Sequence, residues 1–210
     1  MAPLSVPLRS AAVSLALSGL IVAMVLPLHP SILSRPVGEV VADTPLWTMI
    51  HAAGVLVFPL ALLGSLAIVA VHHRMIGRSG SIGIALTFVG AFGGMALFAL
   101  EAIAFPVLAQ QAPHLLSLDG PIMASWQVRF LAGMTFGWPL GLALVGLGAA
   151  RAGAFPRAAG VLLAVSGPAF LLLYGLFVPI AGLLASLLFG GVQVWWAALL
   201  WRTAVRTGRG

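Results

Sequence analysis

The stretch that decides the fold is residues 81–108, SIGIALTFVGAFGGMALFALEAIAFPVL, which contains one acidic residue, Glu101, and no basic residue. An apolar run of this length exceeds the roughly 20 residues that a helix needs to cross a bilayer. A helix on the surface of a soluble protein would carry polar residues along its exposed face. The stretch therefore predicts a transmembrane helix.

The rest of the chain has the same character. Of its 210 residues, 61% are hydrophobic and 7% are charged, and the mean hydropathy is +1.15. We expect six helices, with approximate bounds 11–28, 46–71, 81–108, 130–150, 160–177 and 181–201. Six spans of roughly 20 residues leave only short loops. The prediction is one integral membrane domain, 1–210, of the all-α class: a polytopic bundle of six transmembrane helices.

Two patterns concern how the helices are arranged. When the third and fifth helices are aligned at a constant shift, two glycine pairs coincide, Gly83 with Gly160 and Gly90 with Gly167. Such matches indicate a repeated two-helix hairpin, although apolar sequences also resemble one another through composition alone. Small residues also recur every fourth position, in the sets Gly133, Gly137 and Gly141; Gly182, Ser186 and Gly190; and Gly90 and Gly94. Because such spacing lets backbones approach closely, we expect the first set to contact another helix of the same chain. Contact with a second copy is the alternative, so an oligomer stays open.

The ten basic residues, all arginine, predict the orientation in the membrane. Eight fall on one side of the predicted helices and only Arg35 and Arg129 on the other; the eight are Arg9, Arg74, Arg78, Arg151, Arg157, Arg202, Arg206 and Arg209. Because positively charged loops stay in the cytoplasm, we expect a multi-pass protein of the cell inner membrane with both termini cytoplasmic. Since these charges are spread over short loops, the expected partners are membrane lipids and not nucleic acid.

Several kinds of chemistry are excluded by the sequence. Without cysteine there is no disulfide, thiolate metal ligand or thiol nucleophile, and without lysine there is no phosphate-binding P-loop. His72 and His73 are adjacent at a predicted cytoplasmic helix end, and no H-E-x-x-H motif occurs. Only His51 lies clearly inside a predicted helix, which does not favour a haem held by two histidines. We therefore expect no metal site and no cofactor.

Glu101 is the main candidate for a functional residue. An ionised carboxylate inside a membrane helix costs about 2.5–3.5 kcal/mol, so such residues usually have a partner or a function. His51 and Arg129 occupy the outer ends of the second and fourth predicted helices, and we expect one of them to be the nearest polar partner of Glu101. Tyr174, the only tyrosine, lies five residues before a proline, as Glu101 does, and is the fourth candidate.

Three interpretations of this group remain open. The first is a structural clamp, in which Arg129 neutralises Glu101 and His51 hydrogen-bonds nearby. The second is a ligand or proton site, in which Glu101 and His51 change protonation or hold a polar group of a solute. The third is an enzyme centre, in which a glutamate and a histidine supply a general acid and a general base for a membrane-dissolved substrate. The hypothesis is an outward-facing polar pocket for the binding or passage of a small solute or a proton, and the expected ligand is either a small molecule or a lipid-like one. The alternatives are a membrane-embedded enzyme acting on a lipid or isoprenoid, and an accessory subunit without its own chemistry.

Two short motifs carry a resemblance to other proteins. They are the turn RAGAFPR, residues 151–157, which is followed by an apolar helix, and Leu100-Glu101-Ala102 with Pro106 downstream. In these motifs the chain resembles a broad group of small uncharacterised bacterial six-helix membrane proteins. No established activity belongs to that group, so the resemblance implies only the six-helix topology.

Overall fold

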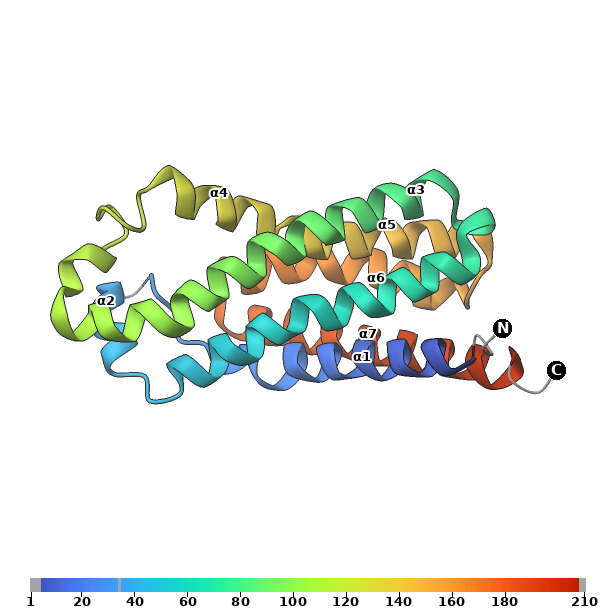
Figure 1. The fold of residues 1–210 in the computed structure, drawn as a ribbon, viewed down its shortest axis with the longest axis horizontal. Helices are drawn as coiled ribbons and strands as arrows, with labels where there is room; N and C mark the ends of the chain where they lie inside the picture. The colour runs from blue at the N-terminus through green and yellow to red at the C-terminus, as the bar shows by residue number, and fades with distance from the viewer. Residues whose placement is uncertain (1–4, 34, 208–210) are drawn as a thin grey trace.

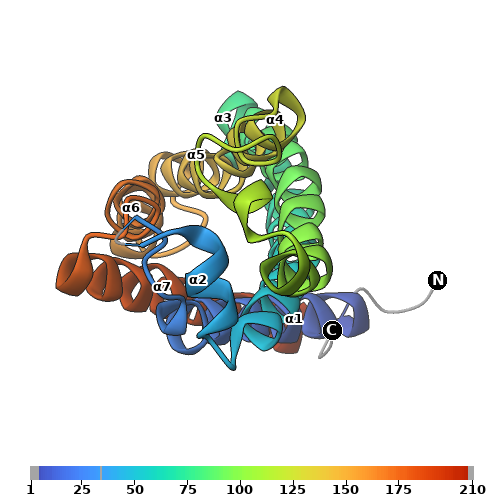
Figure 2. The same cartoon turned by 90° about the vertical axis from the view of Figure 1, so that its left-hand side faces the viewer.

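The computed structural model describes residues 5–33 and 35–207. Six helical segments of the described part are long and apolar enough to cross a membrane: Pro7–Leu28, Trp47–His72, Arg74–Gln111, Trp126–Ala152, Arg157–Tyr174 and Pro179–Arg206. The six segments lie side by side with their axes roughly parallel and form one helical bundle (Figures 1 and 2). The predicted all-α bundle of six transmembrane helices is confirmed, and the chain is a multi-pass membrane protein.

The spans are built from the following elements. In chain order they are α1 (Ser5–Met24), the 3-10 helix η1 (Leu26–Leu28), α2 (Val37–Ala42), α3 (Trp47–Gln111), the 3-10 helix η2 (Pro113–Leu116), α4 (Trp126–Thr135), α5 (Gly137–Ala152), α6 (Arg157–Ala169), the π-helix η3 (Phe170–Tyr174) and α7 (Pro179–Thr207). The predicted bounds of the six helices differ from the bounds of the six spans by a few residues at most of their ends.

The long helix α3 is two antiparallel spans joined by a tight turn. Its helical geometry is interrupted at His72 (φ −114°, ψ 16°) and at Gly77 (φ 63°, ψ −149°). The Gly77 conformation is accessible only to glycine, because a Cβ atom would clash with the backbone. We call Trp47–His72 the first limb of α3 and Arg74–Gln111 the second limb. The chain thus reverses within a few residues, whereas the sequence predicted a longer loop between 71 and 81.

Glycines allow helix α5 to pack closely against α3 on one side and against α6 on the other. A Cβ added to Gly137 would lie 2.6 Å from the carbonyl oxygen of Leu86 on the second limb of α3. On the other side, a Cβ on Gly160 of α6 would lie 2.7 Å from the carbonyl oxygen of Gly146 on α5. The predicted contact of the glycine ladder with a helix of the same chain is confirmed at Gly137. It is also confirmed at Gly141, which faces the backbone of Gly83 and Thr87.

The first member of that ladder behaves differently. A Cβ on Gly133 would meet nothing within 4 Å, so the expectation is wrong at this position. The physical reason is that the predicted helix 130–150 is divided: α4 ends at Thr135 and α5 begins at Gly137. Pro139 has no N–H to donate to the carbonyl of Thr135, so helical hydrogen bonding is interrupted here and α4 departs from the line of α5.

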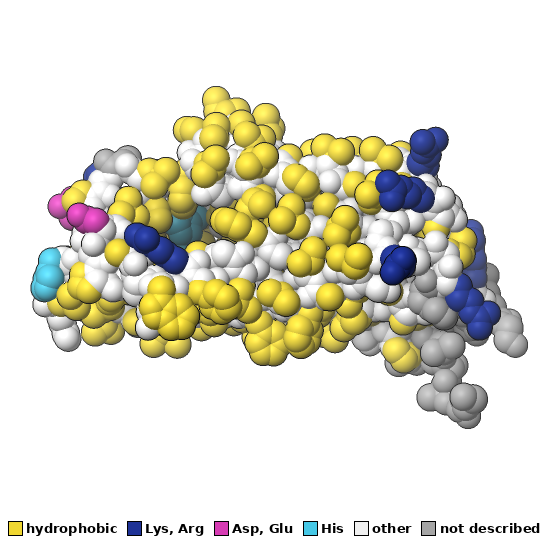
Figure 3. All heavy atoms as spheres, turned by 90° about the horizontal axis from the view of Figure 1, so that it is seen from above, with side chains coloured by type: hydrophobic (Ala, Val, Ile, Leu, Met, Phe, Trp, Pro, Cys, Tyr) yellow, Lys and Arg dark blue, Asp and Glu magenta, His cyan; other side chains and the backbone are white. Residues whose placement is uncertain are grey.

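The two ends of the bundle differ in charge. The first turn of α1 and the last turn of α7 lie at one end, together with the turns that follow His72 and Ala152 (Figure 1). Arginine side chains gather at that end and the acidic side chains at the opposite end (Figure 3). Arg209 lies outside the described residues. We call the arginine-rich end the inner end and the other the outer end; the cytoplasmic position of the inner end stays a prediction.

A short helix covers the outer end. α2 follows Pro36 and buries Val37, Val40 and Val41 against Trp47 and Phe105 of α3. Sequence periodicity did not indicate this helix, because six residues are fewer than two helical turns. Its valines close the bundle above the candidate site.

Candidate functional site

Glu101 and His51 contact each other at the outer end of α3. Oε2 of Glu101 lies 3.2 Å from Nε2 of His51, and the two side chains are 16% and 1% exposed. The predicted pairing of Glu101 with His51 is confirmed. A carboxylate in this position is thus neither alone nor open to bulk water, which reduces the cost of placing it in the membrane.

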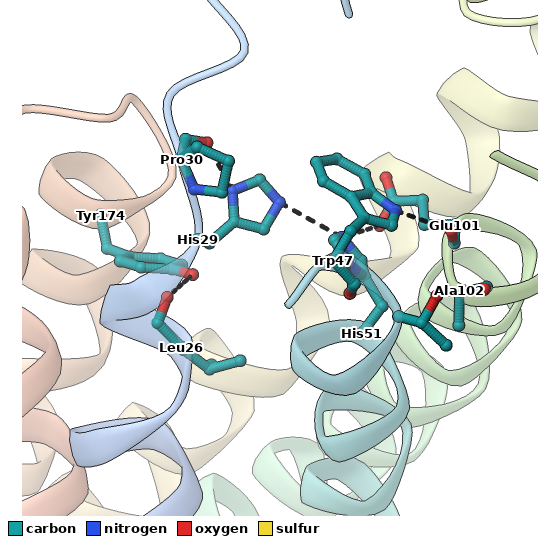
Figure 4. A network of polar contacts seen from close by, with 9 residues as sticks. Leu26, His29, Pro30, Trp47, His51, Glu101, Ala102 and Tyr174 are labelled. Carbon is teal, nitrogen blue, oxygen red and sulfur yellow. Dashed lines mark hydrogen bonds and ion pairs between the residues drawn. The ribbon is translucent and has the colours of Figure 1, made fainter. Parts of the chain in front are cut away.

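Pro106 explains why the two limbs of α3 are joined at this level. A proline lacks the N–H that would bind the carbonyl four residues earlier, here that of Ala102. The hydroxyl of Thr48 donates to this carbonyl at 3.4 Å. The indole Nε1–H of Trp47 donates to the neighbouring carbonyl of Glu101 at 2.8 Å. The first turn of the first limb is therefore fixed to the second limb directly beside the Glu101 side chain (Figure 4).

His29, which follows directly after the first predicted helix, 11–28, is the third member of the cluster. Its Nε2 lies 3.2 Å from Nε2 of His51. Because Pro30 follows, His29 is restricted to an extended backbone (φ −68°, ψ 122°). This conformation ends η1, and the His29 ring lies toward the first limb of α3 (Figure 4). The sequence shows a histidine directly before a proline at the end of an apolar helix, but this pattern does not indicate which helix the side chain contacts.

Backbone carbonyls fix which nitrogen of each histidine carries a proton. Nδ1–H of His51 donates to the carbonyl of Trp47 at 2.8 Å. Nδ1–H of His29 donates to the carbonyl of Pro30 at 2.7 Å. In their neutral forms both rings therefore present the lone pair of Nε2, and the two lone pairs face each other. Nε2 of His51 also faces the Glu101 carboxylate, so these contacts become hydrogen bonds only when the cluster binds a further proton.

Aromatic rings surround the two histidines. The rings of Trp47 and His51 stack with centroids 4.2 Å apart and planes 27° apart. The ring of Phe177 lies 5.4 Å from that of His29. Phe177 has a φ of 52°, a left-handed conformation that is rare for a bulky side chain. Such a conformation costs about 1–3 kcal/mol and is concentrated at functional sites.

The surroundings of His29 disfavour its charged form. The pKa of His29 is lowered from 6.5 to about 4, mainly by burial and also by the neighbouring His51, against a smaller opposite effect of the hydrogen bond to Pro30. His29 is therefore neutral at physiological pH. Any proton that reaches it is held weakly.

The cluster lies at the outer end of a cavity of about 330 Å³. The walls come from both limbs of α3, from α4, α5 and η3, and from the segment after α1, and they are mostly apolar and aromatic. The polar lining residues are His29, Glu101, Thr135 and Tyr174. The end of the cavity that is farther from the cluster is closed by aromatic rings. Phe58, Trp138 and Phe170 pack together there and against the buried Phe189. A hollow in which a histidine is visible opens on a long side of the molecule, among apolar side chains (Figure 3).

The other two candidates from the sequence differ in their relation to the cluster. Tyr174 lines the cavity, stacks on Phe170 with centroids 4.7 Å apart, and donates its hydroxyl to the carbonyl of Leu26 at 2.7 Å. Arg129 is exposed on α4 and forms no ion pair with Glu101. The alternative in which Arg129 neutralises Glu101 is therefore wrong, because a guanidinium at a helix end reaches water at little cost.

The chemistry of the cluster is that of an acid and two imidazoles. Among the described residues, no group of three or more histidine, aspartate or glutamate side chains has an arrangement that could hold a metal ion. The polar atoms that meet are one carboxylate oxygen and two imidazole nitrogens, which accept and donate protons or hydrogen bonds.

Comparisons with known proteins leave the chain without a family assignment. The resemblance to small bacterial six-helix proteins stays a prediction. No family model, no curated protein and no solved structure matches the chain.

Proposed function

We propose that the protein binds a small, largely apolar molecule that carries one hydrogen-bonding group and enters from the outer half of the membrane. The observation that carries this proposal is the cavity of about 330 Å³ with the Glu101 carboxylate in its otherwise mostly apolar wall. Cavities for small ligands have this composition: an apolar lining with a few polar groups that fix the orientation. The volume lies at the small end of the usual range.

The polar groups of the lining indicate where the ligand is held. The hydroxyls of Thr135 and Tyr174 and Nδ1 of His29 already donate to backbone carbonyls. Among the described residues only His51 contacts the Glu101 carboxylate, through Oε2, so the second oxygen can accept a hydrogen bond from a ligand hydroxyl or amine. At the inner end, the buried Nε1–H of Trp138 has no partner in the described part of the chain.

The geometry favours binding over passage through the membrane. A path across the membrane needs polar groups at the midplane, whereas the inner end of this cavity is closed by the rings of Phe58, Trp138 and Phe170. The hollow on the long side of the bundle supports entry from the lipid phase (Figure 3). We infer an inner-membrane location with the cavity toward the outer leaflet, from the arginine distribution.

Photolabelling tests this proposal. The probe is a medium-chain aliphatic alcohol carrying a diazirine, added to the protein in lipid nanodiscs, and the labelled residues are identified by mass spectrometry. We expect label on cavity residues such as Leu97, Thr135 and Leu171, and competition by the unlabelled alcohol. Ala132→Phe, which fills the cavity from α4, should remove this label.

The neighbouring Gly133→Phe is the matched control, since Gly133 is exposed and does not line the cavity. It should leave the labelling unchanged. Label found only on the lipid-facing surface, or equal labelling of the Ala132→Phe and wild-type proteins, would refute the proposal.

Acid–base catalysis on the bound molecule is a second candidate, favoured by the direct contact of Glu101 with His51 beside the cavity. A carboxyl group and an imidazole can act as general acid and general base. The variant Glu101→Gln distinguishes the two functions by its expected effect. For a binding protein, Glu101→Gln weakens capture of the labelled alcohol; for an enzyme, it leaves a bound substrate that is no longer converted.

A further inference from the structure

His29 stands between two separate cavities. The first is the membrane cavity described above. The second, of about 210 Å³, lies at the outer ends of α1 and α7 and is lined by Pro27, His29, Ser31, Tyr174, Phe177, Val178, Pro179, Gly182 and Leu183. Val178 and Pro179 are exposed, which places this second cavity at the outer surface. We call it the vestibule.

We propose that His29, His51 and Glu101 form a proton relay that connects the vestibule with the membrane cavity. His29 lines the vestibule, Glu101 lines the membrane cavity, and the buried His51 touches both of them. The inference deepens the proposed function, since it states how the carboxylate that faces the ligand gains and loses its proton.

Each transfer uses a contact within hydrogen-bond range. A proton from vestibule water adds to Nε2 of His29 and gives an imidazolium. It passes over 3.2 Å to Nε2 of His51, which leaves His29 neutral. It then passes over 3.2 Å to Oε2 of Glu101, which leaves His51 neutral and gives a carboxylic acid. The net change is one proton moved from water to the carboxylate, and release follows the same steps in reverse.

The hydrogen bonds of the rings suit this task. Both transfers at His51 occur at the same nitrogen, so its Nδ1–H can stay on the carbonyl of Trp47 throughout. No tautomer change or ring flip is needed at this fully buried side chain. At His29 the bond from Nδ1–H to Pro30 likewise persists. The lowered pKa of His29 means that a proton there is passed on and not retained.

No other charged group takes part among the described residues. Tyr174 of η3 borders both cavities, but its hydroxyl is bound to Leu26. Glu39 of α2 and Arg129 of α4 belong to elements that pack around the cavity, and both side chains are exposed at the surface. The proton pathway therefore depends on the two histidines.

A time-resolved infrared measurement tests the relay. After a light-triggered pH jump, the carbonyl band of protonated Glu101 is followed in nanodiscs, and the band is identified by its loss in Glu101→Gln. We expect His29→Gln to slow the appearance of this band by about 100-fold, the lower end of what a positioned proton-transfer group contributes. The position of the protonation equilibrium should change much less than the rate, which a merely structural role of His29 would not produce.

His114→Gln is the matched control, because His114 lies exposed at the same outer end and lines neither cavity. In this variant the carbonyl band of protonated Glu101 should appear at the wild-type rate. Equal rates in His29→Gln and wild type would overturn the relay, as would the absence of a Glu101 band at every pH at which the protein stays folded. Either result leaves the alcohol labelling of the cavity unaffected, so failure of the relay is distinguishable from failure of ligand binding.

Discussion

Two glycines of one predicted ladder should respond oppositely to the same substitution. A Cβ on Gly137 would lie 2.6 Å from the carbonyl oxygen of Leu86 and 3.1 Å from the amide nitrogen of Gly90. Both are backbone atoms of a packed helix, so no side-chain rotation relieves the contact and the helices must separate. Overpacking of this kind costs about 1–3 kcal/mol, whereas alanine in place of glycine gains about 1 kcal/mol of helix propensity. Taking the upper end of the cost, we expect Gly137→Ala to lose about 2 kcal/mol.

Gly133→Ala is the matched control, because a Cβ at this position meets nothing within 4 Å. It retains the propensity gain alone and should leave stability unchanged or raise it by up to about 1 kcal/mol. The assay is thermal unfolding in detergent, where 1 kcal/mol corresponds to roughly 2–4 °C for a chain of this size. Gly137→Ala should therefore lower the Tm by about 4–8 °C. Equal changes in Tm for the two variants would refute the packing of α5 on α3.

Three further predictions concern the orientation and the outer end. A reporter that is active only outside the cytoplasm should be inactive when fused after Arg206 and active when inserted at Asp119; the reverse result would invert the orientation. Trp47→Phe removes the hydrogen bond to the carbonyl of Glu101, which should cost about 1 kcal/mol and lower the Tm by roughly 2–4 °C. The pKa of His29 falls from 6.5 to about 4 on folding, so the unfolded chain binds more protons between these pH values and stability should decline as the pH falls through this window. His29→Gln should flatten this part of the curve of Tm against pH, and an unchanged slope would contradict the burial of a neutral imidazole.

The contact between Glu101 and His51 was predictable because it depends on few assumptions. Two apolar runs joined by a short turn form antiparallel helices, and residues near the two distal ends of such a pair lie at similar depth. Because an unpaired carboxylate in the membrane is costly, a nearby polar side chain is expected to pair with it. The same reasoning did not decide between His51 and Arg129. Arg129 lies at a helix end with access to water, and solvation at that end outweighs the ion pair.

His29 shows what the sequence pattern could not provide. Its apolar helix has no polar periodicity that would mark it, and its role depends on the path of the chain after Leu28. That path is determined by the two prolines on either side, Pro27 and Pro30, together with the packing of Phe177 in a left-handed conformation. The position of a loop side chain relative to another helix is a tertiary property, and periodicity carries no information about it.

The cavity has a cause that involves several helices at once. Pro106 and Pro139 lie in helices that line it, and Pro168 lies just before η3, which lines it too. Each of these prolines removes one backbone donor and bends or loosens its helix. After Pro168 the chain continues as a π-helix, a geometry often found at functional sites. Farther from the outer end, glycines such as Gly83 and Gly160 let the same helices touch backbone to backbone. The helices therefore pack tightly in the inner half and separate in the outer half, and this difference opens the cavity beside Glu101, the one carboxylate within the described membrane spans.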